Sequence, residues 1–286
     1  MGRTSQVAAS LSPDSSAGEV VLHYVRAQTT VLRAREAGVR AHDSEAVHKT
    51  RVATRRLRTT LRVFHRLLHQ EHIEPLRSEL QWYSRRLGEV RDLDIVRDLL
   101  LQTLTDLHDP SEEEVRHSVE TTVDRAREHA CVRLDEALNS QRYTDLIAAL
   151  DDLCARPPWR GRAHRRARRV LPELVKEATK RVNRARTRAD EATDPDDRRA
   201  LRHDTRKRAK AVRYAHEALA EALGARSTAR AKRWEAVTED LGADQDLVTA
   251  RIWLDRITAE AVAEGADTAP FARLSAALTL HSDARE

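Results

Sequence analysis

The chain has 286 residues, 34% of them charged and only 3% aromatic, which favours long helices over a sheet-rich protein. This length allows one large or two modest domains. The net charge is +5 and the pI is about 9.5, so the local distribution of charge is more informative than the total. No apolar run approaches the roughly 20 residues of a membrane span, and the N-terminus lacks the apolar segment of a signal peptide. We therefore expect a cytoplasmic protein.

The first half of the chain is predicted to form helices separated by short breaks. A Ser-rich, polar tail at 1–17 is expected to be disordered. We expect Gly38 to end the first helix and Asp43 or Ser44 to cap the second. Gly88 is expected to join the third and fourth helices in a tight turn. The predicted helices span residues 19–37, 46–70, 76–87, 92–108 and 111–139.

The second half continues the helical pattern after a proline-containing break. A short helix follows residue 140, and the segment 156–159, Arg-Pro-Pro-Trp, is the best candidate for a domain boundary. Asp194 and Pro195 form a strong helix start, with an Asp cap and Pro at the first helical position. Further helices are predicted at 171–190, 228–241, 244–263 and 270–280. No segment alternates at period two for long enough to form a strand, so the predicted fold class is all-α.

The segment 46–70 contains seven Lys and Arg residues and three His, but no Asp or Glu. On a helical wheel its apolar and basic residues occupy different faces. The apolar stripe consists of Leu57, Leu61, Phe64 and Leu68. The basic row consists of His48, Arg51, Arg55, Arg58, Arg62 and Arg66. Solvated helices usually place acids one turn from bases, so a row of cations without acids indicates a binding site for an extended polyanion.

The same arrangement recurs in the second half of the chain. Residues 202–219 align with the first basic helix without a gap when His203 is placed on His48, at an offset of 155 residues. A second pair of segments, 87–94 and 241–248, repeats at an offset of 154 residues. Self-similarity at half the chain length indicates a duplicated domain. We therefore predict two helical bundles, one at 18–155 and one at 156–286.

Two pairs of motifs resemble those of the CHAD family, the conserved histidine α-helical domain. They are V-H-x-x-R-V-x-x-R-R-L-R at 47–58 with L-G-x-x-R-D-L-D at 87–94, and H-x-x-R-K-x-x-K-x-x-R-Y at 203–214 with L-G-x-x-Q-D-L at 241–247. The resemblance covers roughly residues 19–280. It implies two four-helix bundles related by pseudo-two-fold symmetry, with the basic helices facing a shared central groove or pore. The E-x-E-x-K signature of the triphosphate tunnel domain, which some members carry, is absent, so the chain is similar to stand-alone members.

The resemblance also implies a ligand, inorganic polyphosphate, and no catalytic activity. The candidate polyphosphate-binding residues are those that match the family's motifs, together with Arg62 of the basic row and Lys207 of the second motif. The full set is His48, Arg51, Arg55, Arg58, Arg62, Arg91, His203, Arg206, Lys207, Lys210 and Arg213. The second half departs from the first at Gln245, which stands at the place of Arg91, and at Glu217, which stands at the place of Arg62. We therefore expect weaker binding at that end of the second half.

Two acidic residues beside the motifs have more than one interpretation. Asp92 and Asp246 either cap the helices that they are expected to begin or hold an Arg of the basic helix toward the ligand. His48 and His203 fit hydrogen-bond donors to phosphate, and neither has the partners that a metal ligand needs. We expect no metal site, no cofactor and no catalytic residue.

The expected function is binding of inorganic polyphosphate in a basic groove, at polyphosphate granules. Polyphosphate is a linear anion without bases, so a narrow row of Arg, Lys and His can bind it through charge-assisted hydrogen bonds. One alternative is a nucleic-acid-binding protein, although only Phe64 and Tyr214 of the ten aromatic residues fall among the basic rows. Another is a metal-dependent polyphosphate or triphosphate hydrolase, although the basic row of 46–70 holds no carboxylate for a metal. The basic patch Arg156–Arg169 either extends the groove or forms a flexible loop.

Overall fold

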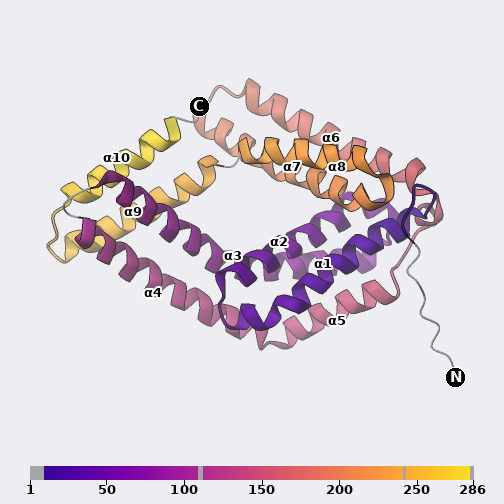
Figure 1. The fold of residues 1–286 in the computed structure, drawn as a ribbon, viewed down its shortest axis with the longest axis horizontal. Helices are drawn as coiled ribbons and strands as arrows, with labels where there is room; N and C mark the ends of the chain where they lie inside the picture. The colour runs from indigo at the N-terminus through magenta and orange to yellow at the C-terminus, as the bar shows by residue number, and fades with distance from the viewer. Residues whose placement is uncertain (1–9, 109–111, 241–242, 284–286) are drawn as a thin grey trace. The chain divides into compact units, whose positions relative to one another are not determined.

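The computed structural model describes residues 10–108, 112–240 and 243–283 (Figure 1). Every regular element in these ranges is helical, which confirms the all-α prediction. The helices are α1 (Ala17–Arg40), α2 (Ser44–Val63), η1 (His65–Leu67), α3 (Gln70–Leu107), α4 (Glu112–Leu138), α5 (Gln141–Ala155), η2 (Gly161–His164), α6 (Ala167–Glu191), α7 (Pro195–Leu223), α8 (Ala225–Asp240), α9 (Ala243–Ala263) and α10 (Ala269–Asp283). Within the described ranges, none of them is both long enough and apolar enough to cross a membrane.

Contacts divide the chain into two compact units, each made of three separate segments. Unit 1 contains Met1–Thr30, Arg56–Arg77 and Ala149–Thr238, and unit 2 contains Val31–Arg55, Ser78–Ala148 and Glu239–Glu286. Helices α1, α2, α3, α5 and α8 therefore each contribute residues to both units. This division differs from the predicted halves at 18–155 and 156–286, which stay a prediction together with their pseudo-two-fold symmetry.

The core of unit 1 contains the apolar stripe predicted for the first basic helix. Its four residues are each at most 1% exposed. Burial of one Leu or Phe side chain contributes roughly 1.5–3 kcal/mol, so Leu57 and Leu61 decide which face of α2 turns inward and which face carries the cations. The predicted helix at 46–70 is wrong at its end, because α2 ends at Val63, so Phe64 and Leu68 are buried in the turn that follows it. Val212 and Leu219 of α7, which align with Leu57 and Phe64 in the repeat, are buried in the same unit.

Helix α3 is one continuous helix of 38 residues, so the predicted break at Gly88 is wrong, and the helix begins at Gln70 instead of the predicted residue 76. Pro75 lies near the start of α3, where a missing N–H disturbs little of the hydrogen-bond ladder. Gly88 lies in the helix interior and is buried, and its role is to leave space beside α2, as described below. Asp92 consequently lies in mid-helix and begins no helix, which excludes its interpretation as a cap.

Helix α1 continues past Gly38 to Arg40, and the turn comes at His42, whose φ is 55°. Gly38 is instead a point of close approach, because a Cβ there would lie 2.7 Å from the Cβ of Ala46 in α2. Asp43 caps α2, as predicted, by accepting a hydrogen bond of 2.7 Å from the backbone N–H of Ala46. Asp194 caps α7 in the same way.

The segment between α5 and α6 belongs to unit 1 and forms hydrogen bonds with the turn between α2 and α3. The backbone N–H of Arg160 donates to the carbonyl of Leu67 at 2.8 Å, and that of His69 donates to Pro158 at 2.9 Å. The Trp159 ring lies 3.0 Å from the position that a Cβ of Gly18 would take. Part of the tail predicted to be disordered is ordered, because the backbone carbonyls of Pro13 and Ser15 accept hydrogen bonds from the N–H groups of Arg168 and Ala167. Residues 1–9 of that tail lie outside the described residues.

Candidate anion-binding site

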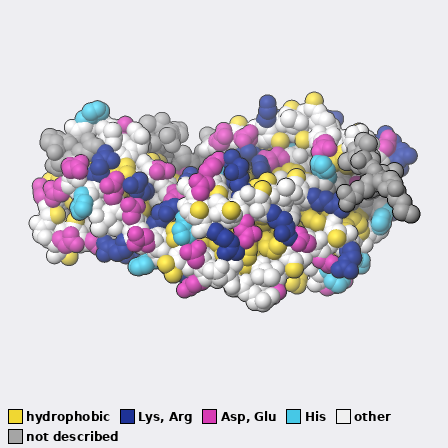
Figure 2. Space-filling model, turned by 60° about the horizontal axis from the view of Figure 1, so that its bottom comes forward, with side chains coloured by type: hydrophobic (Ala, Val, Ile, Leu, Met, Phe, Trp, Pro, Cys, Tyr) yellow, Lys and Arg dark blue, Asp and Glu magenta, His cyan; other side chains and the backbone are white. Residues whose placement is uncertain are grey.

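Acidic and basic side chains are interspersed on the face of the molecule seen in Figure 2. Helix α2 differs from this pattern, because its residues 46–63 contain no Asp or Glu. The predicted binding residues fall into three groups, defined by unit and helix. They are His48, Arg51, Arg55 and Arg91 in unit 2; Arg58 and Arg62 of α2 in unit 1; and His203, Arg206, Lys207, Lys210 and Arg213 of α7 in unit 1.

The four predicted residues of unit 2 share one neighbourhood. Partial burial, followed by the charges of Arg91, Arg55 and Arg51, lowers the pKa of His48 below its ordinary value of 6.5. Burial, with Arg55 and Arg91, also lowers the pKa of Arg51. His48 is therefore neutral at pH 7 and can donate one ring N–H, and an anion bound beside it would favour its charged form. The structure thus brings together residues that lie more than 30 positions apart in the sequence.

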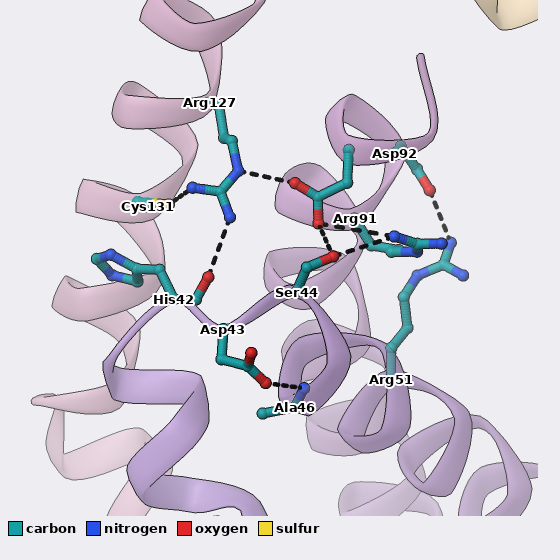
Figure 3. A network of polar contacts seen from close by, with 10 residues as sticks. His42, Asp43, Ser44, Ala46, Arg51, Arg91, Asp92, Arg127 and Cys131 are labelled. Atoms are coloured by element: carbon teal, nitrogen blue, oxygen red, sulfur yellow. Dashed lines mark hydrogen bonds and ion pairs between the residues drawn. The ribbon is translucent and has the colours of Figure 1, made fainter. Parts of the chain in front are cut away.

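Arg51 contacts Asp92 of α3 (Figure 3) and lies beside Gly88 of the same helix. Its Nη2 donates a hydrogen bond of 3.2 Å to Oδ1 of Asp92. A Cβ on Gly88 would lie only 3.3 Å from Nε of Arg51, so the glycine provides the space for the guanidinium. That Nε is buried and has no hydrogen-bond partner among the described residues. Asp92 thus contacts an Arg of the basic helix, which was the second of its two predicted interpretations.

Arg91 is held by a network that the sequence analysis did not identify (Figure 3). Its Nη1 donates to Oγ of Ser44 at 3.2 Å, and Ser44 donates in turn to Oδ2 of Asp94 at 2.8 Å. Asp94 is only 8% exposed and also accepts a hydrogen bond of 2.7 Å from Nε of Arg127 in α4. Arg127 Nη2 donates to the backbone carbonyl of His42 at 3.0 Å. Asp94 ends a motif recognised in the sequence, but no pattern in α4 singles out Arg127.

Asp246 of α9 also belongs to unit 2 and acts on the same group. Its negative charge raises the pKa of Arg51 and that of Asp92. Asp246 is thus electrostatically coupled to the basic row of α2, although its motif follows the second basic helix in the sequence. The side chains of Gln245 and its neighbours from 240 lie outside the described residues.

Helix α7 carries a second basic group in unit 1. Burial, followed by the charges of Lys207, Arg206 and Lys210, lowers the pKa of His203 below its ordinary value of 6.5. Nε of Arg206 donates to the backbone carbonyl of Thr238 in α8 at 3.4 Å. The pKa of His203 thus responds to its basic neighbours in the same direction as that of His48 does in unit 2.

Arg213 differs from the other predicted residues because two carboxylates hold it. Its Nε donates to Oε1 of Glu217 at 2.9 Å, and its Nη2 forms an ion pair with Glu235 of α8. Oε2 of Glu217 also lies 2.9 Å from Nη2 of Arg56 in α2 and accepts a hydrogen bond of 2.9 Å from the hydroxyl of Tyr24 in α1. Glu217 therefore joins three helices of unit 1, at the position where the repeat in the first half has an Arg.

The three groups offer cationic hydrogen-bond donors. Arg guanidinium groups match the geometry of phosphate oxygens and bind them through paired, charge-assisted bonds. Among the residues with described side chains, no three His, Cys, Asp or Glu side chains gather in a way that would hold a metal ion. The arrangement is suited to holding an anion through several donors at once.

Comparison with known proteins adds independent findings. The chain matches the model of the CHAD domain over residues 23–255. It is 31% identical over 240 residues to two uncharacterized proteins of Mycobacterium tuberculosis, MT2285 of strain CDC 1551 and Rv2226 of strain H37Rv. The match covers 82% of this chain and 45% of each relative, so the chain spans about half the length of the curated relatives it matches.

Two solved structures share the fold. The CHAD domain from the plant Ricinus communis is 25% identical, with a TM-score of 0.73 over 97% of this chain and 90% of that one. PptA from Streptomyces chartreusis is 23% identical, with a TM-score of 0.72 over 95% of this chain and 94% of that one. Both likenesses extend over nearly the whole chain, so the helical arrangement is that of the matched domain.

Proposed function

The chain belongs to the CHAD family, and from this premise we propose that it binds inorganic polyphosphate without catalysing a reaction on it. Family membership fits a polyphosphate-related role. We propose in addition that the basic residues of α2 and α7 hold the polyphosphate chain. It includes association with polyphosphate granules, where a binding protein could organise the polymer or bring phosphate metabolism to it.

One observation carries the proposal, namely the gathering of His48, Arg51, Arg55 and Arg91 in unit 2. These side chains come from two helices, and burial together with the charges of Arg55 and Arg91 lowers the pKa values of His48 and Arg51. Like charges that lie this close destabilise the folded chain unless an anion compensates them. The space left by Gly88 and the contact with Asp92 hold Arg51 in this group, which supports a preorganised binding surface over a solvated helix face.

The physical basis of binding would be electrostatic. Each phosphate group of the polymer carries negative charge and acceptor oxygens, and the side chains of α2 present donors along one face of one helix. Release of counterions from the polymer adds to the affinity and makes it fall with increasing salt. The spacing of charges along the polymer would then determine the preference for polyphosphate over nucleic acids, because the protein would recognise no nucleic-acid bases.

The test is titration calorimetry at about 150 mM salt with long-chain polyphosphate, single-stranded DNA and double-stranded DNA as separate ligands. We expect polyphosphate to bind at least about tenfold more tightly than either DNA. The double variant Arg51→Ala/Arg55→Ala should weaken polyphosphate binding by about tenfold or more, and Arg206→Ala/Lys210→Ala should weaken it in the same direction.

A charge-matched control is available beside the unit 2 group. Arg35 and Lys49 are exposed, and Lys49 pairs with Glu45 at 2.7 Å on another face of α2. The variant Arg35→Ala/Lys49→Ala removes the same charge and should leave affinity within about twofold. Equal affinity for DNA would reduce the protein to a general polyanion binder, and unchanged binding in both test variants would refute the assignment of the basic rows. Release of phosphate from polyphosphate that depends on added Mg²⁺ would refute the non-catalytic part.

A further inference from the structure

Asp94 of α3 is a nearly buried acid whose two carboxylate oxygens serve different partners. Its Oδ1 accepts a hydrogen bond of 2.7 Å from Nε of Arg127 in α4. Its Oδ2 accepts one of 2.8 Å from the hydroxyl of Ser44 at the start of α2, and the same oxygen lies 3.8 Å from Nη1 of Arg91. Asp94 therefore connects α4 to the beginning of α2 and to one of the candidate binding residues.

Ser44 is the direct link between Asp94 and Arg91 (Figure 3). Its Oγ donates to Asp94 and accepts a hydrogen bond of 3.2 Å from Nη1 of Arg91. Because the hydroxyl proton points to the carboxylate, the lone pairs of Oγ are left for the guanidinium. Nε of Arg91 is buried and has no hydrogen-bond partner among the described residues. Within that part of the chain, Nη1 is thus the atom through which this guanidinium is held.

Arg127 fixes the carboxylate from a third helix. Its Nη2 donates a hydrogen bond of 3.0 Å to the backbone carbonyl of His42, in the turn that precedes α2. The same guanidinium therefore joins Asp94 to the turn that Ser44 follows two residues later. The hydrogen bond to Asp94 is the largest of the causes that raise the pKa of Arg127. A carboxylate held in this way has one favourable orientation, which fixes the place of the oxygen that Ser44 contacts.

The second repeat does not contain this network at the aligned positions. Arg199 stands at the place of Ser44, and Val248 stands at the place of Asp94. The Val248 side chain accepts no hydrogen bond, and Arg199 pairs with Asp196 of its own helix at 3.0 Å. The contacts that hold Arg91 are therefore particular to the candidate group in unit 2, whereas the basic residues themselves recur in both repeats.

Holding Arg91 in place matters because its neighbours in unit 2 are cations. Partial burial and then the charge of Arg91 lower the pKa of His48. Like charges repel, so a free Arg91 side chain would turn away from this neighbourhood, and an anion would have to order it on binding. Ordering one long side chain in advance is worth about two- to tenfold in affinity.

We propose that Ser44 and Asp94 are positioning residues for Arg91, and that Arg127 of α4 acts on the candidate site only through them. The inference rests on the proposed function, because it gives Arg91 a phosphate group as its ligand. It adds to that function residues that contact no ligand themselves and that hold one cation in a single orientation before the anion binds. Arg127 extends the determinants of binding to α4, which carries none of the predicted binding residues.

The first variant is Ser44→Ala, because it removes one hydroxyl and leaves the Asp43 cap of α2 in place. Titration calorimetry with long-chain polyphosphate should show an affinity about threefold weaker than that of the unaltered chain. Ser44→Thr keeps the hydroxyl and should bind within about 1.5-fold of the unaltered chain. The matched control is Ser118→Ala, which removes a hydroxyl of α4 in the same unit that donates to the backbone of Glu114. It should leave the affinity unchanged, and a loss equal to that of Ser44→Ala would overturn the inference.

A double-variant cycle separates positioning from packing. Asp94→Asn should weaken polyphosphate binding by about fivefold and should also lower the melting temperature, because Arg127 loses its carboxylate. In the Arg91→Ala background the same change should alter the affinity by less than about 1.5-fold, while the loss in melting temperature persists. Equal losses of affinity in both backgrounds would show that Asp94 acts through the fold, which would overturn the inference.

The orientation of Arg91 can also be measured without a ligand. NMR relaxation of its Nε–Hε group, assigned by its loss in Arg91→Lys, should give an order parameter that falls by about a third in Ser44→Ala. An unchanged order parameter would refute the positioning, and a lower one with unchanged affinity would refute its role in binding. Failure of the proposed function is distinguishable, because the unaltered chain would then give no heat with polyphosphate or Arg51→Ala/Arg55→Ala would bind it as tightly as the unaltered chain does.

Discussion

Gly88 shows how one missing side chain makes room for a candidate binding residue. It lies inside the continuous helix α3, where Gly is about 1 kcal/mol less favourable than Ala. The same position leaves space for the guanidinium of Arg51, whose Nε would lie 3.3 Å from an added Cβ. The close approach of Arg51 therefore explains why a residue that weakens its own helix stands at position 88. The Gly of the motif L-G-x-x-R-D-L-D therefore provides space at the candidate site, whereas the sequence alone had indicated a turn.

We predict that Gly88→Ala separates stability from binding. The melting temperature should stay the same or rise, because helix propensity improves and the flexible Arg51 side chain can move. Affinity for polyphosphate should fall by roughly fivefold, measured by titration calorimetry. In the Arg51→Ala background the same change should have little further effect, since the displaced group is already absent. Additive losses in the double variant would contradict this explanation.

At the scale of the helices, Glu217 has a structural role. Its carboxylate contacts Arg56 of α2, Arg213 of its own helix and Tyr24 of α1, and it is only 19% exposed. Burial and the charge of Glu217 together raise the pKa of Tyr24. The expectation of weaker anion binding at this end of the second half remains untested. The contacts nevertheless explain why Glu217 replaces the Arg of the first repeat, because a carboxylate at this position connects α1, α2 and α7.

We predict that Glu217→Gln lowers the free energy of unfolding by roughly 2 kcal/mol, since it leaves the half-buried guanidinium of Arg56 without its carboxylate and leaves Arg213 with Glu235 alone. Urea denaturation followed by circular dichroism measures this loss. Glu221→Gln is the matched control one turn later, where an exposed pair with His23 should contribute less than about 0.5 kcal/mol. Comparable losses in the two variants would refute the role of Glu217 in joining the helices.

At the scale of the whole molecule, both units contain a histidine with the same electrostatic setting. The pKa values of His48 and His203 are lowered below 6.5 by burial and by neighbouring cations. An unfolded chain would therefore bind protons more readily at these positions, so the stability of the free protein should decrease as the pH falls below about 6.5. A bound polyanion acts in the opposite direction, because it favours the charged imidazolium form.

We predict that polyphosphate affinity increases as the pH is lowered from about 7.5 to about 5.5, with net proton uptake on binding. Calorimetry in buffers of different ionisation enthalpy measures that uptake. His48→Gln/His203→Gln keeps a hydrogen-bond donor at each position but cannot be protonated, so it should flatten the pH dependence while the chain stays folded. A pH dependence that persists unchanged in this variant would exclude the two histidines as its source.

The sequence by itself determined the helical class, the family resemblance, the apolar stripe of α2 and the cap at Asp43. These features depend on residues within one or two helical turns, and periodicity and capping chemistry report directly on such local order. The repeat of the two basic segments was also visible, because it is a property of the residues themselves, and the domain duplication that it indicates stays a prediction. The candidate basic rows followed from the same periodicity, and their function stays a proposal.

Only the tertiary structure decided what stands beside each of these elements. In the sequence, Gly88 is equally compatible with a turn and with a position inside a helix that leaves space for a neighbour. The side chain of Arg51, which comes from another helix, shows that the second description holds. The contact between Arg127 and Asp94 joins residues that are 33 positions apart. Local patterns encode which face of a helix is polar, whereas the partner of that face depends on how helices distant in sequence pack.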